Sequence, residues 1–590
     1  MLSVKSKVYF YENIGLAVLA RNYLSKRTIF YSSLSLLVRL ALKLFKLSLP
    51  GNVRGIAYGD LAKSTGIRKI AYEHALYELG KIKLDSFGFS FVAQTQINLE
   101  LIAQKYFLDL LFKKYEFYGM AMQFVAEHDE CSASITVDPL FFDEALVHGK
   151  NIKVVKSIIF YKLEFILSML VQPLFLILFF RRKRVKNNVC LDNSIICEVD
   201  NHNTYNMFYD LFGENNNLKF VINPAYLKNF QQEEIKKLGL IIHGISSEDY
   251  RNLKKIKNIF RVMMSRSILK FSRYGGLMPS LFRVIANGVA LTANARNSAY
   301  LTFEHMNTFK AARNELLRIN GNRSIFVPYN AYSIGHFYVP EYQYNYDILC
   351  SPGKLLERVY LMQNARTQIF LRTGSYHPHK KNTKAKIDDR QTRVKNLLDF
   401  KSAMTVVTVL CNGVQDANHS DEVRLMALAC RLSREMGVKV IVRQKPTNPP
   451  IKYVNFYTDA VFQDKDVLLT HSEYELFDFL EVTDLFITSR SSSALDLCIA
   501  GGQFLSIDFS DDAKDVFFWQ TEVDGVLLKQ ETAFDSIMDW IHDLSGKQRS
   551  AHKNRMLELS GLAAYKFENF DSYKSNILMQ LNPYLPSTIE

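Results

Sequence analysis

The pattern of apolar and polar positions divides the chain near residue 190. Beyond that point, short continuous apolar runs alternate with amphipathic stretches whose apolar residues recur at i, i+3 and i+4 spacing. Continuous apolar runs are typical of strands that are buried on both faces of a parallel sheet. The back of the chain therefore predicts an α/β fold with helices on both faces of its sheets.

The predicted strands form two groups, separated by a polar and cationic connector at 374–389. The first group comprises 194–199, 219–223, 239–243, 298–303, 324–329, 346–350 and 368–373. The second comprises 404–411, 438–443, 453–457, 467–470, 484–489 and 504–508. The clearest helix is 421–437, with Gly437 as its stop. Two such groups predict two Rossmann-like, doubly wound domains that face each other across a cleft.

The front of the chain reads as helix-rich, with a first apolar segment at 33–50. Arg39, Lys43 and Lys46 recur there at helical spacing on one narrow face. Such a helix can lie in a membrane interface with its cations toward the headgroups. It can equally be a buried helix whose cations reach the surface through their long side chains.

A second apolar segment covers 163–180 and is followed by four cations, Arg181 to Arg184. Its 18 residues are barely enough to span a bilayer. Glu164, Gln172 and Pro173 weaken a spanning helix. An interfacial or re-entrant hairpin kinked at Pro173 fits better, with the cations on acidic lipid at the cytoplasmic side. A single span and a buried soluble helix are the alternatives.

These patterns of apolar and polar residues predict the domain organisation. We expect a helix-rich N-terminal region, a membrane-associating segment, two Rossmann-like domains and C-terminal helices, at 1–150, 151–188, 189–385, 386–545 and 546–590. A chain of 590 residues is too long for one hydrophobic core, which agrees with this division.

The net charge of +14 favours an anionic partner, such as an acidic membrane surface or a phosphorylated substrate. The alternative is that the excess cations form a generally basic, solvated surface. The chain lacks the mixed aromatic and basic signature of RNA-binding domains, so nucleic acid is not an expected partner.

Seven cysteines without a CxxC pair predict buried thiols in a reducing compartment. The start lacks a signal-peptide core. We expect a cytoplasmic protein attached peripherally to the inner face of the cell membrane.

A cluster of hydroxyl groups follows the predicted strand 484–489. Ser489, Arg490, Ser491, Ser492 and Ser493 stand where that strand turns into the next helix. Ligands of doubly wound sheets bind at the carboxyl ends of the strands, and the first turn of a helix offers free N–H groups and partial positive charge. One serine would suffice for ordinary N-capping. Three serines with an arginine predict a phosphate or diphosphate site.

A second basic element supports the same site. The strand 438–443 ends in Arg443, and Lys445 follows just before Pro446. Because both strands belong to one parallel sheet, their carboxyl ends share an edge. Arg443 and Lys445 are therefore expected close to the serine turn.

The back half resembles glycosyltransferases of the two-Rossmann GT-B architecture. It is most similar to the bacterial surface-polysaccharide branch, which includes capsule and lipopolysaccharide transferases, sialyl- and Kdo-transferases and teichoic-acid glycerophosphotransferases. The matching motifs are Arg443-Gln444-Lys445-Pro446, the stretch from Ser491 to Asp496, and Gly501-Gly502, where the family has a small turn between that helix and the next strand. The match is good over 400–530, plausible over 190–375 and absent over 1–190. Lys445 stands where the family often has a histidine, so Lys445 would neutralise charge rather than donate a proton.

The resemblance implies a nucleotide-sugar donor in the C-terminal domain, bound as a substrate with no further cofactor. Ser492 and Ser493 would hold its phosphate, with Arg443 and Lys445 stabilising the leaving group. Asp496 would contact the ribose or cap its helix. The acceptor would be a lipid-linked glycan or a polysaccharide. Transfer of a phosphoalcohol from a CDP donor would use the same phosphate site, and a non-catalytic scaffold for polysaccharide assembly is a further alternative.

The catalytic base is expected at a strand end of the N-terminal Rossmann-like domain. Glu198, Asp200 and His202 follow one strand, and Glu304 and His305 follow another. A carboxylate beside a histidine can accept a proton near neutral pH. Asp200, Glu304 and His305 are the candidates, while helix capping is the structural alternative for each.

No metal is expected. The Asp464-Lys465-Asp466 motif precedes a strand and would point away from the cleft, and Asp508, Asp511 and Asp512 are better placed but not diagnostic. His377 and His379 on the connector have no acidic neighbour in sequence and are expected to be solvated. The absence of GxxxxGKS and GxSxG motifs argues against a P-loop nucleotidase and an ordinary α/β-hydrolase.

Overall fold

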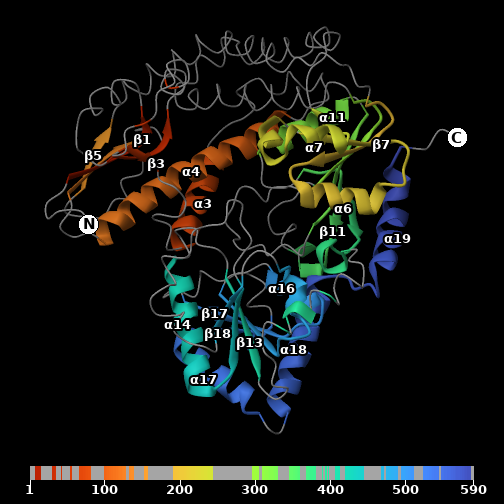
Figure 1. The fold of residues 1–590 in the computed structure, drawn as a ribbon. Coiled ribbons are helices and arrows are strands. Elements are labelled where there is room, and N and C mark those ends of the chain that lie inside the picture. Colours follow the sequence, from red (N-terminus) through yellow and green to blue (C-terminus); the bar gives the residue numbers. More distant parts are fainter. Residues whose placement is uncertain are drawn as a thin grey trace.

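Three parallel sheets organise the protein in this computed structural model (Figure 1). The structure describes residues 7–14, 29–34, 42, 49, 53–55, 65–80, 99–127, 132–137, 152–156, 191–222, 224–242, 295–303, 308–319, 321–329, 345–355, 357–358, 367, 369–380, 389, 392–394, 396, 405–411, 419–443, 467–470, 474–489, 493–509, 523–543 and 546–586. The fold below refers to these residues.

The first Rossmann-like sheet has strand order β12-β11-β10-β9-β6-β7-β8. Its strands are β6 (Ile195–Val199), β7 (Leu218–Ile222), β8 (Ile241–Ile242), β9 (Ala299–Thr302), β10 (Arg323–Phe326), β11 (Ile348–Ser351) and β12 (Ile369–Arg372). The chain starts at β6, builds outward to β8, and then returns to the other side of β6 at β9. The direction of winding therefore reverses between β6 and β9, which is the switch point where such sheets bind ligands.

The second sheet repeats this order as β15-β14-β13-β16-β17-β18. Its strands are β13 (Val406–Leu410), β14 (Lys439–Arg443), β15 (Val467–Thr470), β16 (Leu485–Thr488), β17 (Phe504–Asp508) and β18 (Leu527–Lys529). Its switch point lies between β13 and β16, and the predicted serine turn follows β16. The predicted strands agree with those described, apart from the missed edge strand β18 and from 453–457, which lies outside the described residues.

Both faces of the second sheet are covered, as the continuous apolar runs predicted. Val406 and Leu410 of β13 face a core that also contains α16 (Ser493–Ile499) and α18 (Lys547–Ala563). Val407 and Val409 face the opposite core, with α14 (His419–Met436) and α17 (Gln530–Ile541). Alternate strand residues point to opposite faces, so an apolar strand serves two cores at once.

Two glycines end helices of this domain as the sequence predicted. Gly437 follows α14 with a φ of +61°, and its N–H bonds the Ser433 carbonyl at 3.1 Å. Gly501 follows α16 with a φ of +95°. Left-handed backbone of this kind closes a helix at little steric cost only when the residue is glycine.

The first sheet has two covered faces as well, although one of its helices comes from the far end of the chain. Helix α6 (His202–Phe212) and helix α19 (Phe570–Leu581) share one core, which contains Met207, Phe208, Tyr573 and Ile577. The opposite core contains Tyr300 and Leu317, the latter from α11 (Thr308–Ile319). In Figure 1, α19 runs beside the first sheet, while α18 stays with the second. The C-terminal helices therefore tie the two domains together.

The front section holds a sheet that the sequence analysis missed. Its order is β3-β2-β1-β4-β5, and its strands are β1 (Lys7–Ile14), β2 (Ile29–Leu34), β3 (Val53–Gly55), β4 (Ser132–Val137) and β5 (Ile152–Lys156). The predicted helix-rich character is present in α3 (Thr65–Gly80) and the long α4 (Leu99–Glu127). The expectation of a region built from helices was thus incomplete, because its strands are short and mixed in polarity.

The two apolar segments of the front section have different outcomes. In 33–50, Ser33 and Leu34 belong to β2 and Leu42 is helical; Leu42 and Leu49 pack against Ile29. These contacts favour the buried alternative for that part of the segment. The segment 163–184 lies outside the described residues. Among the helices that the structure describes, none has the length and apolarity needed to cross a membrane.

The remaining elements between and beyond these are short. They include η4 (Pro224–Asn229), α7 (Gln232–Lys237), η7 (His377–His379), η9 (Leu476–Phe479) and η12 (Asn582–Tyr584). Five cysteines, Cys197, Cys350, Cys411, Cys430 and Cys498, are buried thiols that form no disulfide, as predicted for them.

Candidate functional site

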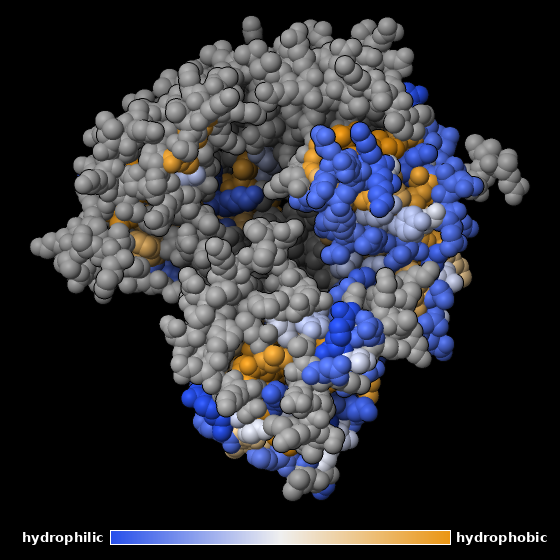
Figure 2. Space-filling model, in the orientation of Figure 1, coloured by the Kyte–Doolittle hydropathy of each residue, from blue (hydrophilic) through white to orange (hydrophobic). Residues whose placement is uncertain are grey.

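The carboxyl edges of the two Rossmann-like sheets meet in this structure. From the first sheet come Tyr329, which follows β10, and His377, which follows β12. From the second come η9, after β15, and α16, after β16. Because every strand in each sheet is parallel to its neighbours, both ligand-binding edges converge at this junction. Figure 2 shows the surface hollowed where the front section and the two Rossmann-like domains come together.

At the switch point of the first sheet lies a buried cluster of charges. Lys310 Nζ is 2.9 Å from Glu198 Oε2 and 3.7 Å from Asp200 Oδ2, and it donates to Thr302 Oγ1 at 3.1 Å. Arg313 Nη1 bonds Glu198 Oε2 at 2.5 Å. Both cations come from α11, which follows β9, while both carboxylates come from the end of β6. The cluster thus joins the two strands that flank the switch point.

Asp200 is held at this edge by the capping of α6. Asn201 is the N-cap, and its side chain accepts from the Thr204 N–H at 3.1 Å. Thr204 Oγ1 in turn accepts from the Asp200 N–H at 3.1 Å. Because Asn201 performs the capping, the Asp200 carboxylate is left to face Lys310. It is 4% exposed, at the rim of the charge cluster.

Glu198 has a structural role in this arrangement. Its side chain is fully buried and shared between Arg313 and Lys310. The Arg313 guanidinium also lies over the Tyr300 ring, 4.7 Å from its centroid. Burial, and then the charge of Glu198, raise the pKa of the Tyr300 hydroxyl. His202, the third residue of this group, is exposed and lies 3.7 Å from Glu234.

At the edge of the second sheet, Arg443 is the last residue of β14. It pairs in register with Leu410 of β13 and Thr470 of β15, so it lies one strand away from the switch point. Its side chain is only 7% exposed, and its Nε has no hydrogen-bond partner among the described residues. Burial lowers its pKa to about 10, against the opposing effects of Cys411, Asp478 and Glu475.

This arginine differs from the arginine of the first sheet. Arg313 is fully buried but bonded to Glu198, whereas the Arg443 Nε is a buried donor with no acceptor in the described part of the chain. An unsatisfied buried donor costs free energy. A protein can retain such a donor when a bound ligand supplies the missing acceptor. Its position next to the switch point suits a phosphate.

The connector attaches to the second domain through a histidine–carboxylate hydrogen bond and a lysine–carboxylate ion pair. His377 Nδ1 is 2.8 Å from Asp496 Oδ2 of α16, and Lys380 Nζ is 3.2 Å from Glu475 Oε2. Asp496 is 2% exposed and the His377 side chain 20%. The sequence prediction that His377 and His379 are solvated is therefore wrong. Their acidic and aromatic partners come from distant parts of the chain.

Aromatic rings hold both histidines. The His377 ring stacks on Tyr329 at 5.2 Å and also contacts Phe477 at 4.9 Å. His379 stacks on Tyr573 at 5.3 Å, and burial lowers its pKa. Burial, with smaller contributions from Asp496 and Glu475, raises the pKa of the Tyr329 hydroxyl. This tyrosine is therefore a neutral hydroxyl at the junction.

The predicted site residues have three outcomes. Asp200, Arg443, Ser493 and Asp496 are described, at the carboxyl edges where the sequence analysis expected them. Asp496 has a partner that was not foreseen, His377. The others lie outside the described residues, namely Glu304, His305, Lys445, Arg490, Ser491 and Ser492.

Sequence reasoning missed Lys310, Tyr329 and Glu475. A lysine three residues into a helix that follows a strand was a usable signal for Lys310, since that helix starts at the switch point. Tyr329 and Glu475 had no distinctive local pattern. Within the part of the chain that the structure describes, no group of three or more His, Cys, Asp or Glu could hold a metal ion. Asp508 ends β17, and the other aspartates considered for a metal lie outside that part.

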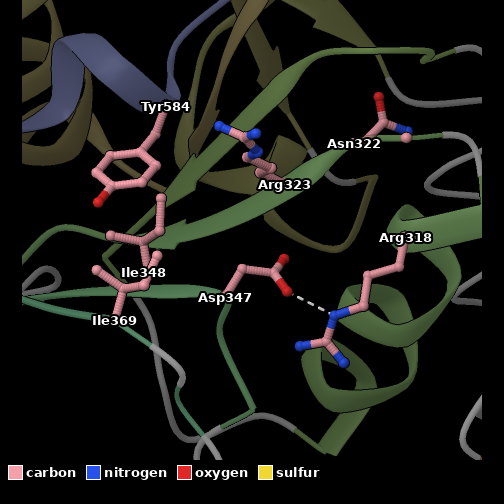
Figure 3. A pocket seen from close by; sticks show the side chains of 8 residues that line it. Arg318, Asn322, Arg323, Asp347, Ile348, Ile369 and Tyr584 are labelled. Atoms are coloured by element: carbon pink, nitrogen blue, oxygen red, sulfur yellow. Dashed lines mark hydrogen bonds and ion pairs between the residues drawn. The ribbon is translucent and has the colours of Figure 1, made fainter.

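A separate pocket of about 350 Å³ opens at the opposite, amino edge of the first sheet (Figure 3). Arg318 and Asp347 form an ion pair there at 2.5 Å, and Arg323 lies 5.8 Å from the Tyr584 ring centroid. Its lining comprises Arg318, Gly321, Asn322, Arg323, Asp347, Ile348, Ile369 and Tyr584. Because most of these residues lie at the starts of strands or near the end of α11, the pocket is remote from the junction of the carboxyl edges.

Comparison with known proteins yields likenesses of fold. No protein-family model matches the chain, and no curated protein matches its sequence. Among solved structures, it is similar to a putative UDP-N-acetylglucosamine 2-epimerase from Listeria monocytogenes, with a TM-score of 0.40 and 10% identity over 67% of this chain and 97% of that one. A structure of the wall teichoic acid polymerase TagF has a TM-score of 0.40 and 11% sequence identity, over 71% of this chain and 98% of that one. HepE from Anabaena, in complex with UDP and glucose, has a TM-score of 0.38 and 8% sequence identity, over 67% of this chain and 100% of that one.

These likenesses are distant, and the strand orders stand independently of them. Two sheets with the Rossmann order, joined at their carboxyl edges and tied by a C-terminal helix that returns to the first sheet, form a GT-B-like α/β fold.

Proposed function

We propose that the protein is a glycosyltransferase that moves a sugar from a nucleotide-activated donor to a cell-surface polysaccharide or lipid-linked glycan. The observation that carries this proposal is Arg443, a buried arginine beside the switch point of the second sheet whose Nε has no hydrogen-bond partner among the residues that the structure describes. A pyrophosphate supplies the acceptors that this guanidinium lacks. The serine turn after β16 would hold the other phosphate oxygens, as the sequence analysis expected.

The acceptor half of the proposal concerns the first sheet. Asp200 lies at its switch point, at the rim of the Lys310 cluster, and is the described candidate for the base that takes the acceptor proton. Glu304 and His305 follow β9 in sequence and belong to the same proposed site. The cationic and apolar segment 163–184 would bring the cleft near a lipid-linked acceptor.

A nucleotide-binding experiment tests this proposal. Purified full-length protein is heated with CMP, CDP, UDP, GDP or dTDP, and the midpoint of unfolding is followed. A ligand present at about a hundred times its dissociation constant adds roughly 2.7 kcal/mol to stability. We expect stabilisation by one nucleotide class in the wild type and its loss in Arg443→Met.

The variant also reports on the cost of the buried charge. Methionine keeps much of the apolar stem, so the ligand-free Arg443→Met protein is expected to be as stable as the wild type or more stable. Arg393→Met is the matched control, since Arg393 is exposed and pairs with the nearby Asp389. Retained nucleotide stabilisation in Arg443→Met, or none in the wild type, would count against the proposal.

A further inference from the structure

His377 and Asp496 have the geometry of an acid–base pair at the junction of the two carboxyl edges. The 2.8 Å contact uses His377 Nδ1, so the other ring nitrogen, Nε2, is the one available to a reacting group. Nε2 makes no hydrogen bond to any described residue. A buried carboxylate that orients an imidazole is the arrangement by which a histidine is prepared for proton transfer.

The surroundings fix this ring in one orientation. Tyr329 stacks on one side and Phe477 contacts it on another, while the backbone N–H of His377 donates to the Tyr329 carbonyl at 2.6 Å. The ring is thus held between an element of the first domain and one of the second. One fifth of its side chain stays exposed, which leaves it accessible from the junction.

The other described residues of the site are not suited to donate a proton to the leaving phosphate. Arg443, with a pKa of about 10, stays protonated at neutral pH and can stabilise charge but not donate a proton. Asp200 and the Lys310 cluster belong to the other edge, about the switch point of the first sheet. Histidine is the side chain whose ordinary pKa suits proton exchange near pH 7.

We propose that His377, oriented by Asp496, is the general acid for the leaving phosphate; this rests on the proposed function. The bond between the transferred carbon and the phosphate oxygen breaks, and its electron pair stays on that oxygen. The oxygen takes the proton from His377 Nε2. The acceptor oxygen bonds to the carbon and gives its proton to a base at the edge of the first sheet. Exchange of one proton each with solvent restores both groups.

Four charged or titratable groups belong to the contacts of the junction around His377. They are Asp496 of α16, Glu475 before η9, Tyr329 after β10 and Lys380 after η7. Glu475 is engaged by Lys380 at 3.2 Å, so Asp496 is the carboxylate bonded directly to the ring.

The test compares His377→Asn with Lys380→Gln. Asparagine can still donate a hydrogen bond to Asp496 but cannot donate a proton to a phosphate. Glutamine at 380 removes the lysine–carboxylate ion pair between the connector and the second domain, and leaves the histidine intact. If His377 only tethers the domains, the two variants should behave alike.

The first readout is the affinity for the nucleotide found by the binding panel, measured by calorimetry between pH 6 and 8. A protonated His377 next to the phosphate makes the wild type bind more tightly at the acidic end, relative to His377→Asn. Lys380→Gln should keep the wild-type pH dependence. Because all proteins meet the same ligand, the titration of the phosphate itself cancels in the comparison.

The second readout is nucleotide release from the corresponding donors, with UDP-glucose, UDP-N-acetylglucosamine, CMP-N-acetylneuraminate and CDP-glycerol as probes. Loss of a general acid lowers the rate on the order of 10²-fold or more, with a much smaller change in affinity. Imidazole added to His377→Gly should restore part of the rate. Identical pH profiles in wild type and His377→Asn would overturn the acid role while leaving nucleotide binding intact. If none of the nucleotides binds, both proposals fail.

Discussion

Single residues in this protein show how burial alters a charged or titratable group according to its partners. Arg313 is fully buried and paired with Glu198, whereas Arg443, at the edge of a sheet, has one donor that no described residue accepts from. His552 in α18 is a third case. It is 2% exposed, its Nε2 has no hydrogen-bond partner among the described residues, and burial together with Arg555 lowers its pKa to about 4.

This histidine predicts acid sensitivity of the second domain. The folded-state pKa lies below the unfolded value of 6.5, so the unfolded state binds the proton first as the pH falls. Stability is complete above about pH 6.5 and is lost toward pH 4, with about 2 kcal/mol gone between pH 7 and pH 5. His552→Gln should reduce this loss in urea titrations at the two pH values. The exposed His542→Gln is the control and should retain it; an unchanged acid loss in His552→Gln would refute the assignment.

At the scale of elements, α19 is the helix whose position departs most from its place in the sequence. It follows the second domain along the chain, but Tyr573, Ile577 and Leu581 are fully buried against the first sheet. Its N-terminus is capped by Asn569, whose side chain accepts from the Ser572 N–H at 2.9 Å. Helix α19 therefore completes a core that the first domain does not cover by itself.

Truncation on the two sides of α19 should have very different effects. Ile577→Ala removes a fully buried side chain and is expected to cost 2–5 kcal/mol of stability, the usual range for this change in a core. Met579→Ala on the same helix, where the side chain is 69% exposed, should change stability by less than about 0.5 kcal/mol. Chemical denaturation of both variants measures the difference. Equal effects would mean that α19 is not packed on the first sheet.

At the scale of the whole molecule, backbone contacts bring the two domains together near Gly353. Gly353 follows β11 of the first sheet, and a Cβ at this position would lie 2.2 Å from the Ala563 carbonyl oxygen at the end of α18. The neighbouring Tyr565 N–H donates to the Pro352 carbonyl at 2.8 Å. This close approach joins the two domains on the same side as the connector.

Gly353→Ala is therefore expected to weaken the junction. Because the clash is with backbone, relief requires a shift of one domain against the other, and a loss of about 1–3 kcal/mol is expected. Gly561→Ala is the matched control in α18, since nothing lies within 4 Å of its Cβ. Alanine there should raise stability by about 0.5–1 kcal/mol. Calorimetry can also detect separate unfolding of the domains in Gly353→Ala; a transition like that of the wild type would contradict the tight contact.

The sequence by itself determined the local elements of both Rossmann-like domains. Strands such as β6 and β13 are apolar at four of their five positions because both of their faces are buried, and this pattern can be read from each strand's own sequence. Gly437 and Gly501 marked helix ends because their positive φ excludes most side chains. The edge position of Arg443 also followed from the sequence, since parallel strands place all their carboxyl ends on one side. The short mixed strands of the front sheet gave no comparable signal.

Only the tertiary structure decided which charged groups meet. His377 and Asp496 are 119 residues apart in sequence, and Arg313 and Glu198 are 115 apart. No periodicity connects such pairs, because their contact depends on how whole domains pack. The same reason explains why the histidines of the connector were mistaken for solvated residues and why α19 was not assigned to the first sheet. Local pattern specifies the elements, whereas long-range packing specifies the chemistry at their junction.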